Sequence, residues 1–315
     1  MKIQRKCLKS GVVNALIASA LVAASPAFSS SLPNTQDSPT QMVITALPSH
    51  SVKPANLVTG DVKVLRGKTP LPVVRLDRLA GNLSDMQLFV LLDDSTRSTS
   101  LGIQLPELKR FVESLPPSTE VAIGYMRNGT FGLVQPFTSD HEIAAGALRL
   151  PEAIPGGNGS PYFALSDLVK HWPSRQSTDR RAVLMLTDGV DRYYTTATSD
   201  DPYVDTAIRD SLKEGVLVYS IYLRGSGIYG RGSWVTEFSQ SRLIEVSENT
   251  GGHAYFQDLG DPVTISPFLR DFENRLDNQY LVTFQGLSEK GVQAVKVRTE
   301  APGVKIEAPT HIYVP

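Results

Sequence analysis

Cysteine is almost absent from this chain of 315 residues, which contains only Cys7. A single cysteine excludes an intramolecular disulfide framework and any cysteine-based zinc site. An excess of charge of one sign is missing too, because 31 Lys and Arg stand against 32 Asp and Glu, without long runs of either sign. Since nucleic-acid-binding domains carry clustered basic residues, this balance predicts that no nucleic acid is a partner.

No apolar run approaches the roughly 20 residues that a membrane-spanning helix needs. The longest, residues 11–24, follows four basic residues and precedes Ser25-Pro26-Ala27. This order is typical of a secretory signal peptide, and we predict that residues 1–27 are one, cut after Ala27. Cys7 precedes the apolar run, so it leaves with the peptide and is not a lipid anchor. We therefore expect an exported protein, periplasmic or secreted, with no transmembrane segment.

Loss of the signal peptide changes the charge of the chain. Its four basic residues go with it and no acidic one does, so 27 basic residues remain against 32 acidic ones. The remaining chain contains no cysteine. At this length, burial of apolar surface is enough to stabilise an exported protein without disulfides.

The composition divides the exported chain into four parts. Residues 28–56 are rich in Ser, Pro, Thr and Asn, which predicts a flexible leader. Residues 57–84 contain short β-like runs broken by prolines and are expected to form a β-rich arm. Residues 279–315 contain further strand candidates and are expected to form a C-terminal β-rich tail, with which the arm could pair. Residues 85–278 remain for one α/β domain.

Three continuous apolar runs in this α/β domain indicate buried parallel strands: residues 88–92, 182–186 and 216–223. Helical patterns separate them. This alternation predicts a doubly wound, mostly parallel, Rossmann-like sheet. Asn128-Gly129 between two strand candidates predicts an antiparallel hairpin at the edge of that sheet.

Polar residues follow the first two buried runs. Asp93 and Ser95 come after the first, Asp188 comes after the second, and a Gly-rich loop between them ends at Ser160. Each aspartate taken singly is explained as the cap of a helix or turn. Three such loops at the carboxyl ends of strands point instead to one site, because doubly wound sheets bind ligands there. Carboxylate and hydroxyl oxygens are the ligands of hard divalent cations.

These three segments resemble the three parts of the metal-ion-dependent adhesion site of von Willebrand factor type A domains. The resemblance covers residues 85–260 in order and spacing, and the β-rich flanks resemble a bacterial exported subgroup of the family. It places metal ligands at Asp93, Ser95, Ser160 and Asp188. It implies a divalent ion, Mg²⁺ first, with Mn²⁺ or Ca²⁺ as alternatives. It also implies a protein partner, which could complete the ion's coordination with an acidic side chain.

Arg97 departs from the family's Asp-x-Ser-x-Ser motif, because it stands at the third ligand position and a guanidinium has no lone pair for a metal. Three arrangements are open. Arg97 points into solvent beside a weakened metal site, or it bridges Asp93 and Asp188 in place of the ion, or the register slips so that Asp94 and the hydroxyls after it face the site. Asp94 and Asp191 add negative charge nearby in each case.

The leading hypothesis is a non-enzymatic exported protein that mediates protein–protein interaction or adhesion through this partly degenerate site. An alternative is a structural component of the cell envelope in which the site is vestigial. A further alternative is a metal-dependent, phosphatase-like hydrolase with Asp93 as nucleophile. Such enzymes usually need a second aspartate two residues later, where this chain has Ser95.

Overall fold

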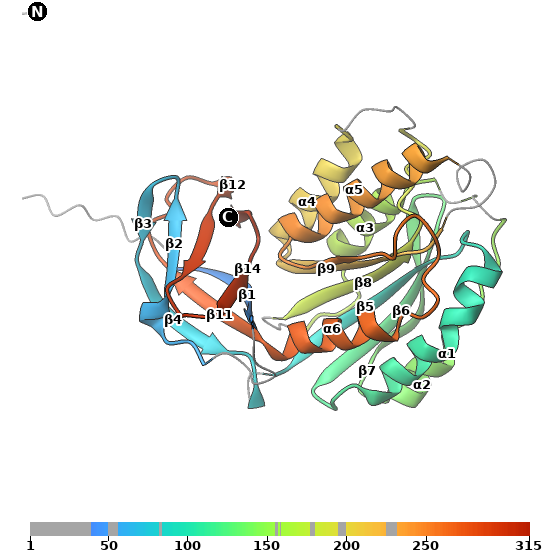
Figure 1. Ribbon diagram of the computed structural model, residues 1–315, viewed down its shortest axis with the longest axis horizontal. Coiled ribbons are helices and arrows are strands. Elements are labelled where there is room, and N and C mark those ends of the chain that lie inside the picture. Colours follow the sequence, from blue (N-terminus) through green and yellow to red (C-terminus); the bar gives the residue numbers. More distant parts are fainter. Residues whose placement is uncertain are drawn as a thin grey trace, which may run out of the picture. The chain divides into compact units, whose positions relative to one another are not determined.

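The computed structural model describes most of the chain after residue 38, and the predicted signal peptide lies outside the described residues (Figure 1). The described ranges are 39–49, 56–81, 84–154, 157, 159–176, 180–194, 200–224 and 232–315. Within these ranges, no helix is long and apolar enough to cross a membrane.

A six-stranded sheet forms the centre of the α/β domain, in the order β10-β9-β8-β5-β6-β7. Its strands are β5 (Met86–Asp93), β6 (Thr119–Arg127), β7 (Thr130–Thr138), β8 (Arg181–Thr187), β9 (Val216–Tyr222) and β10 (Ala254–Tyr255). All neighbours pair in parallel except β6 and β7. The strand order reverses between β5 and β8, since the chain adds β6 on one side of β5 and β8 on the other. The predicted doubly wound, mostly parallel sheet is confirmed.

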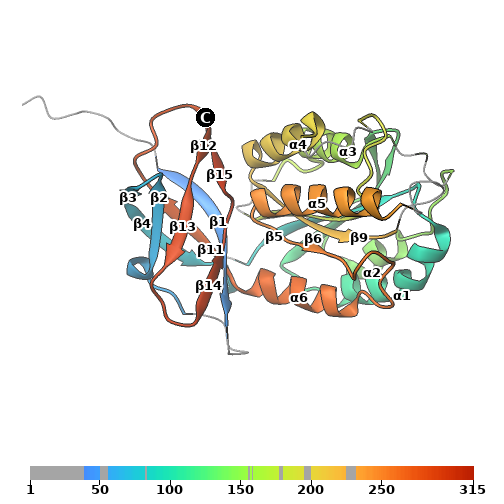
Figure 2. The same cartoon turned by 45° about the horizontal axis from the view of Figure 1, so that its top comes forward.

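Helices cover both faces of this sheet (Figure 2). They are α1 (Ser98–Ser114), α2 (His141–Gly146), α3 (Pro161–Lys170), α4 (Pro202–Lys213), α5 (Ser233–Asn249) and α6 (Ser266–Asp277). Leu88, Val90 and Leu92 of β5 join a core with α1, α2 and α6, whereas Phe89 and Leu91 join one with α3, α4 and α5. Successive side chains of a strand point to opposite faces, so burial on both faces requires a strand that is apolar throughout.

The edge hairpin turns at Asn128 and Gly129, whose φ angles are 54° and 73°. Both values lie in the left-handed region, which a two-residue type I′ turn requires and which Asn-Gly tolerates well. The predicted antiparallel edge is therefore present as β6 and β7.

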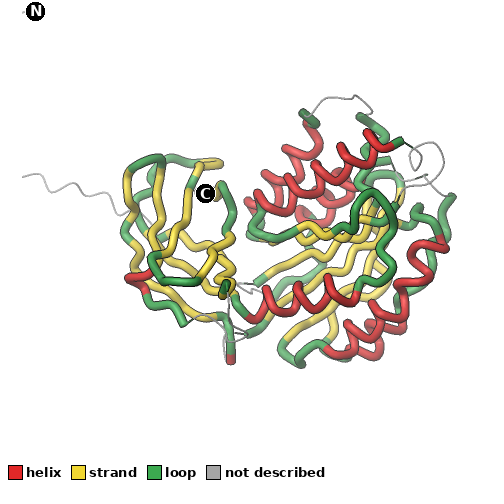
Figure 3. The backbone as a smooth tube through the Cα atoms, viewed as in Figure 1, coloured by secondary structure: helices red, strands yellow, loops and turns green. Residues whose placement is uncertain are grey.

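The flanking strands form three small sheets in the orders β14-β1-β11-β4, β13-β2-β3 and β12-β15. Their bounds are β1 (Thr40–Pro48), β2 (Val62–Arg66), β3 (Thr69–Leu71), β4 (Val73–Arg78), β11 (Gln279–Phe284), β12 (Gly291–Ala294), β13 (Lys296–Thr299), β14 (Val304–Glu307) and β15 (His311–Val314). A short 3₁₀ helix, Thr59–Asp61, precedes β2. These strands enclose a hydrophobic core of their own, and Figure 3 shows them as a mostly yellow, strand-rich part of the chain. The predicted pairing of arm and tail is confirmed by β4 with β11 and β2 with β13.

The prediction of a flexible leader is wrong for residues 40–48. They form β1, which pairs with both β11 and β14. Met42, Ile44 and Ala46 are buried in the core of the flanking sheets. The apolar residues of this segment are few and have polar residues on either side. The segment therefore forms a strand only through partners more than 200 residues away in sequence.

Arg180 links the flanking strands to the central sheet. It is 6% exposed and donates to the carbonyl oxygens of Leu276 (2.8 Å), Ser84 (3.1 Å) and Leu79 (3.3 Å) and to Oε1 of Gln279 (3.0 Å). Burial lowers the pKa of Arg180 to about 10, so its guanidinium stays charged at neutral pH. One side chain thus joins the start of β8, the entry to β5, the end of α6 and β11.

We expect Arg180→Met to lower the free energy of unfolding by about 3 kcal/mol, because buried carbonyl oxygens lose their donors. Arg181→Met is the matched control. Arg181 is partly exposed, and its guanidinium lies 5.7 Å from the ring of Trp172. Its loss should cost less than about 1 kcal/mol. Urea unfolding of both variants measures the difference, and equal losses would contradict the role of Arg180.

Candidate functional site at the carboxyl ends of the strands

The candidate site lies where the strand order reverses. β5 ends at Asp93 and β8 ends at Thr187, and these strands are paired neighbours. Open α/β sheets bind ligands at this point. The hydroxyl of Thr187 donates to Oδ2 of Asp93 over 3.0 Å, which joins the two strand ends directly. We call the surface formed by the segments that follow β5, β6, β8, β9 and β10, together with the segment from the end of α2 to the first turn of α3, the strand-end face.

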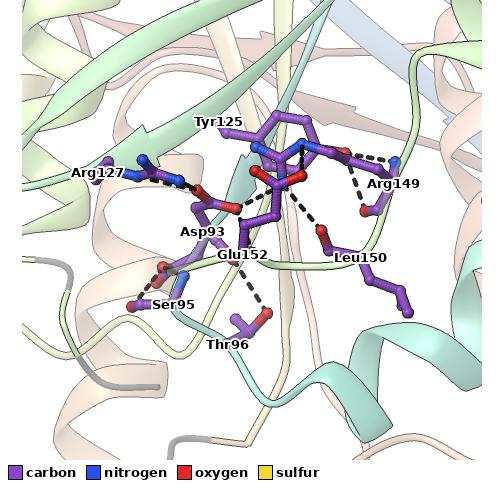
Figure 4. Close-up of polar contacts among 9 residues, drawn as sticks. Asp93, Ser95, Thr96, Tyr125, Arg127, Arg149, Leu150 and Glu152 are labelled. Carbon is purple, nitrogen blue, oxygen red and sulfur yellow. Dashed lines mark hydrogen bonds and ion pairs between the residues drawn. The ribbon is translucent and has the colours of Figure 1, made fainter. Parts of the chain in front are cut away.

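Asp93 is the most enclosed carboxylate of the predicted set, with 1% of its surface exposed. Its Oδ1 accepts hydrogen bonds from the backbone nitrogen (2.9 Å) and the hydroxyl (2.8 Å) of Ser95 (Figure 4). Burial raises the pKa of Asp93, and the negative charge of Asp188 raises it further. The two carboxylates are therefore close enough to repel each other, and an ionised pair needs a positive charge beside it.

That positive charge comes from Arg192. Its Nη2 donates to Oδ2 of Asp188 over 2.6 Å, and the two side chains are 10% and 3% exposed. The backbone nitrogen of Val190 donates to the other oxygen of Asp188, at 3.0 Å. The charge of Arg192 also acts on Asp93, whose pKa it lowers against the larger effects of burial and Asp188.

Gly189 gives the loop after β8 its course. Its φ is +66°, and a Cβ atom at this position would lie 2.9 Å from the backbone oxygen of Ser239. Both the left-handed backbone and the close contact require glycine here. The turn directs Asp188 and Arg192 to the same side of the loop, where they pair.

Ser160 and Asp191 form a second pair beside the first. Ser160 is fully buried at the N-cap of α3, where its hydroxyl accepts from the backbone nitrogen of Phe163. The same hydroxyl donates to Oδ2 of Asp191 over 2.6 Å. Oδ1 of Asp191 accepts from the backbone nitrogens of Tyr193 (2.8 Å) and Tyr194 (3.0 Å). Gly156, at the start of the predicted Gly-rich loop, lies outside the described residues.

Asp94 faces away from Asp188. It is 1% exposed and accepts from Nη1 of Arg149 (2.7 Å), from the backbone nitrogen of Glu152 (2.9 Å) and from the guanidinium of Arg127 (Figure 4). Burial alone would raise the pKa of Asp94, but the hydrogen bonds from Arg149, Glu152 and Arg127 outweigh it and the pKa is lowered. Asp94 thus holds the loop after α2 against the end of β5.

Arg97 occupies the N-cap position of α1 and is partly exposed. It forms no ion pair with any residue that the structure describes. The guanidinium on Asp188 is that of Arg192 instead. Neither does the register slip by one residue, because Asp94 faces Arg127 and the hydroxyl of Thr96 donates to the backbone oxygen of Asp93.

Arg192 was not among the residues that the sequence predicted for the site. The only available signal was its position, a basic residue four places after Asp188 in an otherwise acidic and aromatic loop. Sequence spacing in a loop does not say where a side chain points. A pairing that depends on the turn at Gly189 is visible only in the folded chain.

The described residues do not fit the divalent ion that the resemblance implies. The oxygens of Asp93 and Asp188 all accept hydrogen bonds from the chain itself. The hydroxyls of Ser95 and Ser160 donate to carboxylates. Within the described ranges, no group of three or more His, Cys, Asp or Glu side chains is placed to hold a metal.

The strand order and the antiparallel edge strand of the central domain are consistent with the von Willebrand factor type A fold that the resemblance implies. No protein-family model and no curated protein sequence matches the chain.

Solved structures similar to the chain include an aerotolerance-related membrane protein from Bacteroides fragilis, with 14% identity over 61% of this chain and 98% of that one (TM-score 0.42). The conserved hypothetical protein BatB from Bacteroides thetaiotaomicron has 15% identity over 60% and 96% (TM-score 0.43). The pilus adhesin SpaC from Lactobacillus rhamnosus GG has 10% identity over 79% and 46% (TM-score 0.45). At these identities the likeness concerns the fold alone.

We expect Asp94→Asn to lower the free energy of unfolding by about 2 to 3 kcal/mol at pH 7, because charge-assisted hydrogen bonds from two arginines are lost. The folded pKa of Asp94 lies below the ordinary value of 3.8. Its stabilising effect is therefore complete above that pH and disappears as the pH falls through the folded pKa. Urea unfolding of both proteins at pH 3 to 7 should show a difference that shrinks below about pH 4.

Glu152→Gln is the matched control for this prediction. The side chain of Glu152 is 64% exposed and pairs with Nε of Arg149 at 3.3 Å. An exposed ion pair of this kind contributes less than about 1 kcal/mol. A loss in Glu152→Gln as large as that in Asp94→Asn would show that Asp94 is not the residue that holds the loop.

Proposed function

We propose that this chain is an exported protein-interaction module that binds a partner protein through its strand-end face. The observation that carries the proposal is the gathering of exposed, large apolar side chains on that face. They are Ile103, Leu150, Ile154, Phe163, Tyr193, Trp234, Phe256, Leu259 and Val263. Ile154 is 81% exposed and Val263 is 78% exposed. Apolar side chains gathered on one surface are typical of protein-binding sites.

The aromatic residues among them are supported by one another. The rings of Phe163 and Tyr193 meet edge to face at 5.7 Å, and Phe163 lies 4.4 Å from the ring of Tyr203. Trp234 makes an edge contact with Phe238 at 6.2 Å. Exposed aromatic side chains held in place by neighbours lose little entropy on binding and often contribute most of the energy of an interface.

Two arginines on the same face, Arg97 partly exposed and Arg127 exposed, supply the charge that an acidic partner would meet. Arg97 has no ion-pair partner among the described residues, and the side chain of Arg127 is 52% exposed although it pairs with Asp94. Guanidinium groups bind carboxylates through two parallel hydrogen bonds. An acidic side chain of the partner would therefore bind these arginines directly.

The metal-dependent form of this function has less support. In that form Mg²⁺, Mn²⁺ or Ca²⁺, held by Asp93, Ser95, Ser160 and Asp188, would bridge to the partner's carboxylate. The oxygens that would ligate the ion are occupied by hydrogen bonds from the chain, and Arg192 already neutralises Asp188.

Two other functions are also less well supported. A hydrolase would need Asp93 as an accessible nucleophile, but Asp93 is 1% exposed and hydrogen-bonded at both oxygens. A structural component of the envelope with a vestigial site would have no use for exposed aromatic side chains on the strand-end face. It predicts that changes on this face leave partner capture intact.

Site-specific photo-cross-linking tests the proposal. A photoreactive phenylalanine analogue replaces Ile154, Tyr193 or Trp234 in the full chain, expressed in its source organism. We expect one discrete adduct, shared by the three positions, because these residues lie on one binding surface. Ile143 and Val74, which are 54% and 50% exposed but lie elsewhere, are the controls and should give no such adduct.

The protein identified in the adduct is then purified and its affinity is measured. We expect Tyr193→Ala to weaken binding by about 10-fold or more, as truncation of an aromatic anchor does. Ile143→Ala should leave the affinity unchanged. Equal adducts at the control positions, or unchanged binding by Tyr193→Ala and Trp234→Ala together, would contradict the strand-end face as the binding surface.

A further inference from the structure

We propose that Arg192 takes the place of the divalent cation, so that its positive charge offsets part of the buried negative charge and the strand-end site works without a metal ion. This inference concerns the carboxylates of the site and does not depend on which partner binds.

The buried carboxylates of the site require a positive charge close to them. Asp93 and Asp188 are 1% and 2% exposed, and carboxylates buried this deeply require compensation by a cation. In a metal site the ion supplies that charge. Here the guanidinium of Arg192 supplies it, 2.6 Å from Asp188 and with only 10% of its side chain exposed.

Backbone contacts also hold Arg192 beside Asp188. Its own nitrogen donates to the carbonyl oxygen of Gly159 over 2.8 Å, which joins the loop after β8 to the loop before α3. Its Nη1 donates to the carbonyl oxygen of Val190 over 3.2 Å. Arg192 is thus held both at its backbone nitrogen and at its guanidinium. An incoming ion would have to displace this guanidinium, or else two positive charges would share the same site.

The hydroxyls of the site also serve the chain's own carboxylates. Ser95 donates to Asp93 and Ser160 donates to Asp191, at 2.8 and 2.6 Å. Ser160 also accepts from the backbone nitrogen of Phe163, which leaves its oxygen fewer free lone pairs for an ion. Arg97, at the position of the third ligand, has no lone pair to offer.

A metal titration of the purified mature chain tests this inference without any partner, so its outcome is separate from that of the cross-linking experiment. We expect no heat of binding and no loss of the free Mn²⁺ spectrum in electron paramagnetic resonance. The midpoint of thermal unfolding should also be the same in EDTA and in Mg²⁺, Mn²⁺ or Ca²⁺, because a ligand that binds the folded state would raise it.

Removal of the guanidinium should create the site that it replaces. We expect Arg192→Gln to acquire Mn²⁺ binding, seen in the resonance spectrum, and a midpoint of unfolding that rises with Mn²⁺. Adding Asp188→Ala to this variant should abolish both effects. Arg192→Lys, which retains a positive charge, and Arg97→Gln, which removes the arginine of the motif, are matched controls and should gain nothing.

Two results would overturn the inference. One is Mn²⁺ binding by the unaltered chain that Asp188→Ala abolishes. The other is an Arg192→Gln variant that gains no response to Mn²⁺. If Arg192→Gln is unfolded by circular dichroism, the same titration still decides, because recovery of the folded spectrum on addition of Mn²⁺ supports the inference and no recovery overturns it.

Discussion

Negative charge buried between two neighbouring parallel strands is the constraint around which the strand-end face is built. Asp93 and Asp188 are almost inaccessible to water, and the charge of Asp188 raises the cost of ionising Asp93. Arg192 offsets that cost from within the chain. Because its backbone also bonds to Gly159, the charge pair fixes the relative position of the loops after β8 and before α3. Tyr193, the next residue, is thereby placed at the surface, 53% exposed.

A rigid polar centre under an apolar rim suits a surface that binds another protein. Asp94, which pairs with Arg127 and Arg149, holds the loop that carries Leu150 and Ile154. Loops held in this way present their apolar side chains at little entropic cost. The charges that are costly to bury are thus paired inside, while Arg97 and Arg127 remain accessible for recognition. The flanking strands are joined to the central sheet through Arg180. They enclose a hydrophobic core of their own and contribute no residue to the strand-end face as defined above.

Much of the fold could be predicted from the sequence, because its signals are local. The continuous apolar runs became β5, β8 and β9, and Asn128-Gly129 became the edge hairpin. The strand at residues 40–48 could not be predicted, since its neighbours β11 and β14 come from the other end of the chain. The sequence predicted helices between these strands, and α1 is one of them, from Ser98 through Pro106 to Ser114.

The sequence by itself determined which residues end the strands, and with them that carboxylates and hydroxyls meet at one edge of a doubly wound sheet. Only the tertiary structure decided what these groups do there. The direction of a loop side chain depends on the turn that carries it and on the charges that face it. The left-handed turn at Gly189 and the burial of Asp188 selected Arg192 as its partner rather than Arg97. In a motif that resembles a metal site, the chain's own arginine thereby pairs with one of the two buried carboxylates.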